Sequence, residues 1–224
     1  MLKKLKGLAL VGALTTSMGA FAVPITYIGA DDAVSSFADM VNAQAAASDF
    51  FDVTGPINVF DFESAIPANL TVTGGSTVSS SCGAVCGFNT TAGGSFWRQV
   101  VGGSVTFTFS DPVDAFGFYV NGLQTDLVPQ QTIEYVDGSS IQQIIDMPSA
   151  TGGGGAFLGF VDFGQLISSV TFNATNDVLG FDDLYFGRSA TNPGDPNEIP
   201  VPATLFLFGA GLLSLGFAGR KAKS

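Results

Sequence analysis

The 224-residue sequence contains no histidine and only eight lysines and arginines. The absence of histidine excludes a Ser-His-Asp triad and any zinc site that needs a histidine ligand. No lysine occurs between Lys6 and Lys221, so a Ser-Lys dyad is excluded from the whole central part of the chain. Catalysis there would have to rely on carboxylates.

The few basic residues are also unevenly distributed. Six of the eight lie in the terminal segments, whereas all 19 acidic residues fall between Asp31 and Glu198. Arg98 and Arg188 are the basic residues of that stretch, so its net charge is −17. Such a charge repels nucleic acid and anionic lipid, so the expected partners are cations and neutral polymers.

Cysteine is scarce as well, with only Cys82 and Cys86 in the chain. In an exported protein, two cysteines most simply form one disulfide. The loop that this bridge closes is short, so it would fix a local turn rather than stabilise the whole fold. A metal site at these cysteines is excluded because a third and a fourth soft ligand are missing.

The sequence is rich in glycine, phenylalanine and other apolar residues. It contains 29 Gly and 21 Phe, 46% of its residues are hydrophobic, and only 12% are charged. This composition favours a packed, strand-rich fold with many tight turns over disorder or a helix bundle. Once the two apolar ends are set aside, the remaining length suits one domain, residues 23–191.

The first 22 residues are typical of a signal peptide. Lysines at positions 3, 4 and 6 precede the apolar run from Gly7 to Leu14, and Ala20-Phe21-Ala22 supplies the small residues that signal peptidase accepts. We expect cleavage after Ala22. A retained membrane anchor is the alternative, and the short run, interrupted at residues 15–17, argues against it.

A second apolar segment lies near the other end. Residues 192–198 form a polar, proline-containing linker, and no charge occurs over the 19 residues from Val201 to Gly219. That length can cross a bilayer as a helix. The basic residues that follow place the end of the chain in the cytoplasm and the domain outside it. A buried core helix is the alternative.

The tail, residues 199–224, resembles a PEP-CTERM sorting domain. The resemblance rests on Ile199-Pro200-Val201-Pro202-Ala203, on the apolar run after it, and on the basic end. It implies recognition by an exosortase and transfer from the membrane to the cell surface or an extracellular polysaccharide matrix. The usual Pro-Glu-Pro of that family is Pro-Val-Pro here, at Pro200, Val201 and Pro202.

Between the two ends, the patterns predict one helix followed by strands. Asp31 and Asp32 can cap a helix in which Val34, Phe37, Val41 and Ala45 recur at helical spacing. Beyond it, apolar and polar residues alternate in short segments separated by turn signals. The predicted strands are 59–63, 70–73, 96–101, 105–110, 113–120, 131–137, 141–146, 156–161, 166–173 and 179–186.

This order predicts a mainly β domain, an antiparallel two-sheet sandwich of jelly-roll type. The pattern also resembles exported lectin-like jelly rolls and carbohydrate-binding modules. That resemblance rests on Phe60-Asp61-Phe62-Glu63 at the start of the sheet and on Gly180 to Gly187 at its end.

The resemblance implies a structural calcium ion held by acidic residues of the first and last strands, here Asp61, Glu63, Asp182 and Asp183. Calcium takes six to eight oxygen ligands, which such carboxylates and nearby carbonyls could supply. The alternative is that these side chains simply face water.

Two further predictions concern ligands and chemistry. Trp97, the only tryptophan, and its neighbour Arg98 could form a sugar-stacking platform, with core packing as the alternative for Trp97. Asp61 and Glu63 could serve as a glycosidase pair, with plain surface charge as the alternative.

The leading hypothesis is a non-enzymatic exported protein of the cell surface or biofilm matrix, which binds polysaccharide or acts as an adhesive or structural unit. The competing hypotheses are a glycoside-acting enzyme that uses Asp61 or Glu63, and a purely structural, calcium-stabilised coat protein.

Overall fold

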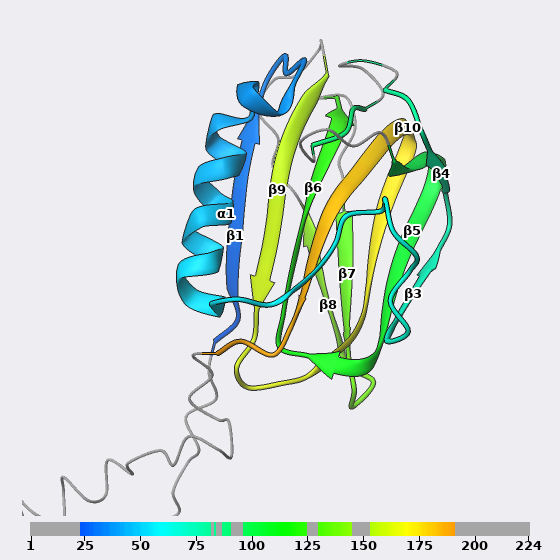
Figure 1. Ribbon diagram of the computed structural model, residues 1–224. Helices are drawn as coiled ribbons and strands as arrows, with labels where there is room; N and C mark the ends of the chain where they lie inside the picture. Colours follow the sequence, from blue (N-terminus) through cyan, green and yellow to red (C-terminus); the bar gives the residue numbers. More distant parts are fainter. Residues whose placement is uncertain are drawn as a thin grey trace, which may run out of the picture.

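The computed structural model describes residues 23–81, 83, 87–90, 96–124, 130–144 and 153–190. These residues form one curled antiparallel sheet with one α-helix on its outer side (Figure 1). The mainly β fold with a single N-terminal α-helix is thereby confirmed.

The predicted signal peptide, the cysteine pair, the linker and the sorting tail lie outside the described residues. Within the residues that are described, no helix is long and apolar enough to cross a membrane.

The sheet runs in the order β1-β9-β6-β10-β5-β3, with β2 and β7 also paired to β10, β4 to β5, and β8 to β7. The strands are β1 (Ile25–Asp31), β2 (Asn58–Phe60), β3 (Leu70–Thr73), β4 (Ser76–Val78), β5 (Trp97–Val113), β6 (Ala115–Leu123), β7 (Gln130–Tyr135), β8 (Ser140–Ile144), β9 (Gly154–Val161) and β10 (Ile167–Gly187).

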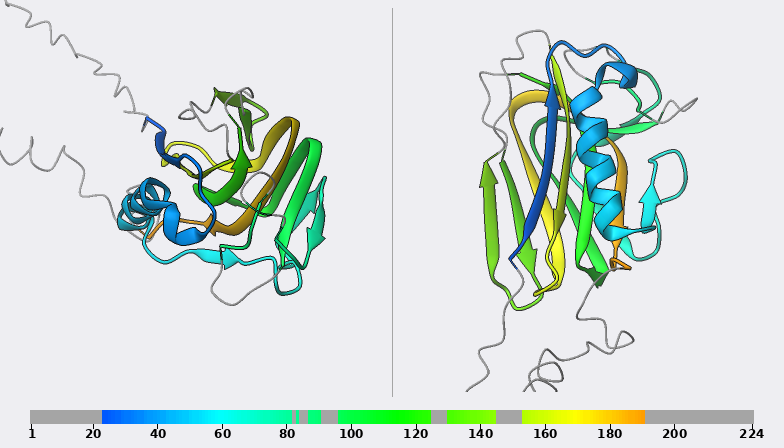
Figure 2. Two further views of the ribbon diagram at one scale, coloured as in Figure 1. Left: turned by 90° about the horizontal axis from the view of Figure 1, so that it is seen from above. Right: turned by 90° about the vertical axis from the view of Figure 1, so that its left-hand side faces the viewer.

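The sheet is continuous because β10 belongs to both of its layers. Its first half, from Ile167 to Asn173, pairs with β7, and its second half, from Gly180 to Gly187, pairs with β6. A register shift between Ala174 and Val178 separates the halves, and such irregularities bend a strand. The prediction of two separate sheets is therefore replaced by one sheet that curls over (Figure 2, left).

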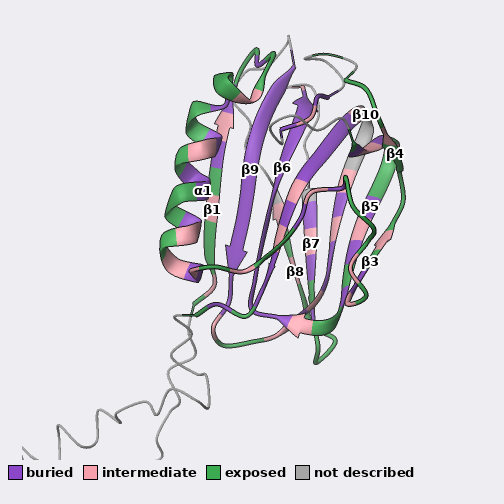
Figure 3. Cartoon of the chain, in the orientation of Figure 1, coloured by how far each residue is buried: buried purple, intermediate pink, exposed green. Residues whose placement is uncertain are grey.

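Two hydrophobic clusters hold this arrangement. The larger fills the inside of the curl and is rich in phenylalanine, with Phe118 and Phe172 in edge-to-face contact. The smaller lies between the sheet and α1 (Val41–Thr54), where Phe50 packs against Phe157. As a result every residue of β6 and of β9 is buried (Figure 3).

Helix α1 begins later than the sequence predicts, and Asp31 caps it from a distance along the chain. Asp31 ends β1, yet its carboxylate accepts hydrogen bonds from the backbone N–H of Asn42 (3.0 Å) and of Ala43 (2.9 Å). It thus caps the helix from outside, because the N-cap residue Met40 makes no side-chain cap bond. Of the predicted apolar series, Val34 is buried and Phe37 packs against the smaller cluster, but Val41 is 66% exposed.

The predicted strand 59–63 is shorter than expected. Strand β2 ends at Phe60, and Phe62 has a positive φ of 60°, so the chain turns there. The turn buries Phe60 and Phe62 together, with ring centroids 4.5 Å apart. Sequence alternation cannot distinguish this turn from a strand that buries one face.

Candidate binding groove at the open seam of the sheet

Residues 88–90 link the two ends of the predicted calcium site. The buried Asp182 carboxylate accepts hydrogen bonds from the Thr90 backbone N–H (2.6 Å) and hydroxyl (2.9 Å). The side chain of the preceding residue, Asn89, donates to the Glu63 carboxylate at 3.3 Å. Asp61 instead accepts a bond from the Glu63 backbone N–H at 3.1 Å, within its own turn.

No group of three or more acidic, histidine or cysteine side chains that could hold a metal occurs among the described residues. Asp183 lies on the β10 bulge with a positive φ of 48°, and its side chain is 3.4 Å from the Thr90 hydroxyl. Calcium binding by Asp61, Glu63, Asp182 and Asp183 therefore stays a prediction.

The structure places Trp97 and Arg98 differently from a shared sugar platform. Trp97 is fully buried, so its ring offers no face to a ligand and packs in the interior. The Arg98 guanidinium donates two hydrogen bonds to the Gly74 carbonyl, at 2.8 and 2.5 Å, and burial lowers its pKa. Core packing is the role that this burial supports for Trp97.

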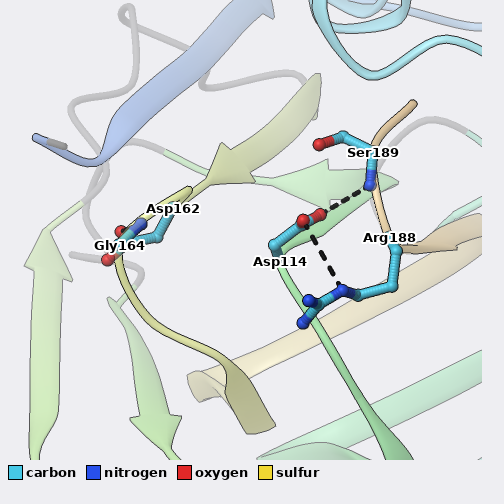
Figure 4. Close-up of polar contacts among 5 residues, drawn as sticks. All are labelled: Asp114, Asp162, Gly164, Arg188 and Ser189. Carbon is cyan, nitrogen blue, oxygen red and sulfur yellow. Dashed lines mark hydrogen bonds and ion pairs between the residues drawn. The ribbon is translucent and has the colours of Figure 1, made fainter. Parts of the chain in front are cut away.

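Buried aspartates at the lower end of the domain hold the chain where it leaves the sheet (Figure 4). Asp114 accepts a hydrogen bond from the Ser189 N–H at 2.7 Å and lies 3.8 Å from the Arg188 guanidinium. Asp162 accepts one from the Gly164 N–H at 2.8 Å and one from the Tyr135 hydroxyl at 2.8 Å. These carboxylates are part of the framework.

The curled sheet stays open along one line, between β1 and β8. Within the described residues, β1 pairs with β9 alone and β8 with β7 alone. The right-hand view of Figure 2 shows β1 and the β7–β8 hairpin from one side. A side-chain hydrogen bond crosses the line, from the Gln143 amide to the Thr26 hydroxyl at 2.8 Å. We call this line the seam.

At its lower end the seam widens into a hollow of about 270 Å³. A second hollow, of about 310 Å³, adjoins it and shares Tyr135 and Gln165 with it. We call these two neighbouring hollows together the seam groove. It is lined by Pro24, Tyr135, Val136, Asp137, Ser139, Ser140, Ile141, Asp162, Gly164, Gln165 and Leu166.

Thr26 and Gln143 lie farther along the seam, two residues beyond the lining residues Pro24 and Ile141. Side chains alternate along a strand, so Thr26 follows Pro24 on one face of the chain, and Gln143 follows Ile141. Ile28 comes next on that face of β1 and is 40% exposed, although the next residue of the series, Ala30, packs against the main core. The inner face of β1 is therefore uncovered where β8 does not pair with it.

A buried amide lies directly behind Gln143. Gln131 is fully buried, and its Nε2 donates to the Gln143 Oε1 at 2.5 Å. Its own Oε1 has no hydrogen-bond partner. Hydrogen bonds from Gln131 to Gln143 and from Gln143 to Thr26 therefore join the interior to the solvent-facing seam. The unpaired acceptor, the Gln131 Oε1, lies at the inner end of this series.

Each of the two hollows of the seam groove has one carboxylate in its lining, Asp137 in one and Asp162 in the other. Burial and the hydrogen bond to Asp162 raise the pKa of Tyr135, so its hydroxyl stays protonated. Hydrogen bonds from Ser139 lower the pKa of Asp137, which keeps that exposed carboxylate ionised. Along the rest of the groove the polar side chains are neutral hydroxyls and amides.

A third hollow, of about 350 Å³, lies where the chain passes from α1 to β2. It is lined by Phe51, Gly55, Pro56, Ile57, Val59 and Tyr185. Burial first, and the nearby Asp183 charge second, raise the pKa of Tyr185.

Sequence reasoning missed the glutamines and Thr26. One signal was present: Gln131, Ile133 and Tyr135 alternate on one face of a predicted strand, so an amide shares a face with core residues. The pairing of Gln131 with Gln143 and of Gln143 with Thr26 depends on strand register and on the curl of the sheet.

No family model matches the chain, and no curated protein matches it. Among solved structures it is similar to a variant of the family 29 carbohydrate-binding module CBM29-2, with a TM-score of 0.35 and 10% identity over 59% of this chain and 95% of that one. For a TmCBM61 module in complex with β-1,4-galactotriose, the TM-score is 0.29 and the identity 14%, over 62% and 94%.

A third similar structure is the enzymatically active domain of tailspike protein 4 of bacteriophage CBA120. Its TM-score is 0.30 and its identity 18%, over 54% of this chain and 19% of that one. Scores this low assign neither a ligand nor an activity to the chain.

Proposed function

We propose that this chain is a non-enzymatic exported protein that binds neutral polysaccharide along the seam groove. The observation that carries the proposal is the groove itself: two neighbouring hollows at the lower end of an unpaired seam, with hydroxyl and amide side chains along it. Two neighbouring hollows offer places for successive units of a chain-like ligand, and neutral donors and acceptors suit sugar hydroxyls.

The charge of the domain supports a neutral rather than an anionic polymer. The stretch from Asp31 to Glu198 carries a net charge of −17, and Asp137 and Asp162 line the groove. A polyanion would meet repulsion from the whole surface as well as from these carboxylates. A neutral polymer meets neither.

The engagement of the carboxylates supports a binding rather than a catalytic role. Each of the four buried aspartates, Asp31, Asp114, Asp162 and Asp182, accepts hydrogen bonds that hold separate chain segments together. A glycosidase needs two carboxyl groups directed at one bond of the substrate. Asp61, of the predicted pair, is engaged within its own turn.

Display outside the cell is the second half of the proposal. Strand β1 starts and β10 ends at the same end of the domain (Figure 1), so the chain enters and leaves the domain at the end where Pro24 lines the seam groove. The proposed route is export by the signal peptide, transient anchoring by residues 199–224, and action of an exosortase-type enzyme at Pro200-Val201-Pro202. The destination is the cell surface or an exopolysaccharide matrix.

Affinity electrophoresis of the purified full chain tests the binding proposal. We expect gels that contain a neutral polysaccharide such as xylan, galactan or dextran to retard the chain, and gels that contain alginate to leave it unretarded. Gln165→Leu should weaken the retardation, because it removes the amide that lines both hollows. The matched control is Gln142→Leu, an exposed glutamine of β8 that lines neither hollow.

Two results would contradict the proposal. One is an absence of retardation by every neutral polymer, including the producing cell's own exopolymer. The other is release of reducing sugar that disappears in Glu63→Gln, which would favour the glycoside-acting alternative.

A further inference from the structure

We infer that the Gln131 Oε1 is the specificity-determining acceptor of the seam groove, and that it takes a hydrogen bond from a hydroxyl of the ligand after Gln143 moves aside. The inference rests on the proposed function. It adds that Gln131 makes the most buried contact with the ligand, that the Gln143 side chain moves, and that the ligand must carry a hydrogen-bond donor.

The first observation is the unused oxygen. Gln131 lies on the inner face of β7 with Ile133 and Tyr135, and all three are buried. A buried polar atom without a partner is destabilising, and most buried polar atoms in folded proteins are paired. A hydrophobic side chain of similar size would fill this position without that cost, so folding alone does not account for the amide.

The second observation is that the neighbouring contacts leave the oxygen available. The Gln131 Nε2 is used by Gln143, which fixes the direction of the amide, so the oxygen is the free end. The carbonyl oxygen of an amide can only accept. The complementary ligand group is therefore an O–H or N–H donor.

The third observation concerns access. Gln143 is the half-buried link between the buried Gln131 and the exposed Thr26. Its side chain crosses the seam where no backbone ladder joins β1 to β8 in the described part of the chain. Rotation of this side chain breaks two side-chain hydrogen bonds and no strand pairing. A ligand hydroxyl in the place of Gln143 can accept a hydrogen bond from the Gln131 Nε2 and donate one to the adjacent Oε1.

The chemistry selects a neutral, hydroxyl-bearing ligand such as a hexose or pentose polymer. A carboxylate offers no donor to Oε1 at neutral pH, and the acidic surface of the domain repels it. An ammonium group could donate, but its charge would be buried opposite an amide, and none of the three linked side chains, Gln131, Gln143 and Thr26, is a carboxylate.

Gln131→Met in the full chain tests the inference, because methionine keeps the length of the side chain and removes the acceptor. We expect affinity for the retarding neutral polysaccharide to fall by about tenfold, and the melting temperature to stay unchanged or rise, since an unpaired polar atom is lost. A purely structural role for Gln131 predicts the opposite pair of results.

Thr26→Val is the second variant, and it removes only the hydrogen bond between Gln143 and Thr26. It removes the acceptor that holds Gln143 across the seam, so we expect affinity to rise by a few fold while the ligand contact at Gln131 is kept. Unchanged or weaker binding by Thr26→Val would contradict the part of the inference that assigns movement to Gln143.

The outcomes separate this inference from the proposed function. If the wild-type chain is retarded and Gln131→Met is retarded equally, the inference is overturned and the function stands. If Gln131→Met does not fold, the Gln131 side-chain amide resonances of the wild-type chain report instead. We expect the polysaccharide to shift them, and unshifted resonances during saturable binding would overturn the inference.

Discussion

The buried aspartates and the seam glutamines occupy two regions with opposite hydrogen bonding. At the lower end of the domain, Asp114 and Asp162 accept bonds from the backbone and a tyrosine hydroxyl, and Asp114 lies 3.8 Å from the Arg188 guanidinium. At the seam, Gln131 is equally buried but leaves its oxygen unused. The comparison teaches that buried carboxylates hold this fold together, whereas one buried amide keeps an unpaired oxygen, which we propose for a ligand.

Among the changes that test this comparison, we expect Asp182→Ala to have the largest effect on stability. The change removes the acceptor of two Thr90 hydrogen bonds and leaves the buried Thr90 N–H without a partner. We expect the free energy of unfolding to fall by about 3 kcal/mol, measured by urea titration. Asp61→Ala, in an exposed turn, is the control and should change stability much less. Equal effects of the two changes would remove the distinction between framework and surface carboxylates.

Asp31→Ala should have the next largest effect, because two helix N–H groups lose their acceptor. A lost helix cap costs about 1–2 kcal/mol, and the same carboxylate also accepts from the Asn42 side chain. Faster hydrogen exchange in the first turn of α1 would locate the effect. The neighbouring exposed residue supplies the control, since Asp32→Ala should leave both stability and exchange unchanged.

Helix α1 shows how far sequence reasoning reached and why it stopped. The sequence correctly suggested Asp31 as a cap and a helix after it. The segment between Asp31 and Val41 contains a short 3-10 helix, Phe37–Asp39, instead of helix α1. The cap therefore acts across a gap that local patterns do not reveal.

The strands show the same limit. Segments such as Leu70–Thr73 were predicted with their correct bounds, since turn residues border them. The last two predicted strands are one strand in the structure, β10, and strands β1 and β4 were not predicted. These differences arise because the strands form by pairing with segments that are distant in the sequence. The link between Thr26 and Gln143 spans 117 residues, so the seam groove could be found only after the strands had been placed.

Alkaline pH tests whether the tyrosines belong to the framework. Burial and nearby carboxylates raise the pKa of Tyr119, Tyr135 and Tyr185 above the usual 10.0. The folded state then holds its tyrosine protons more tightly than the unfolded state does, so stability is complete below pH 10 and falls as the pH rises above it. Urea midpoints between pH 8 and 11 would show the fall, and Tyr135→Phe should make it shallower. A pH-independent midpoint would contradict the burial of these hydroxyls.

The smallest expected effect is that of calcium on the melting temperature. Measuring it would sharpen the comparison between carboxylates and amides, because it shows whether protein donors alone satisfy Asp182 and Asp183. Asp182 already accepts from Thr90, so any ion there has few carboxylate oxygens left and should bind only at millimolar concentration, as extracellular sites often do. At about five times such a dissociation constant, linkage gives a gain of about 1 kcal/mol. We therefore expect a small rise in melting temperature in 5 mM calcium, to be absent in excess EGTA, weaker with magnesium, and lost in Asp183→Asn. An identical melting temperature with calcium and with EGTA would mean that protein donors satisfy Asp182 without an ion, and the calcium prediction would then be wrong.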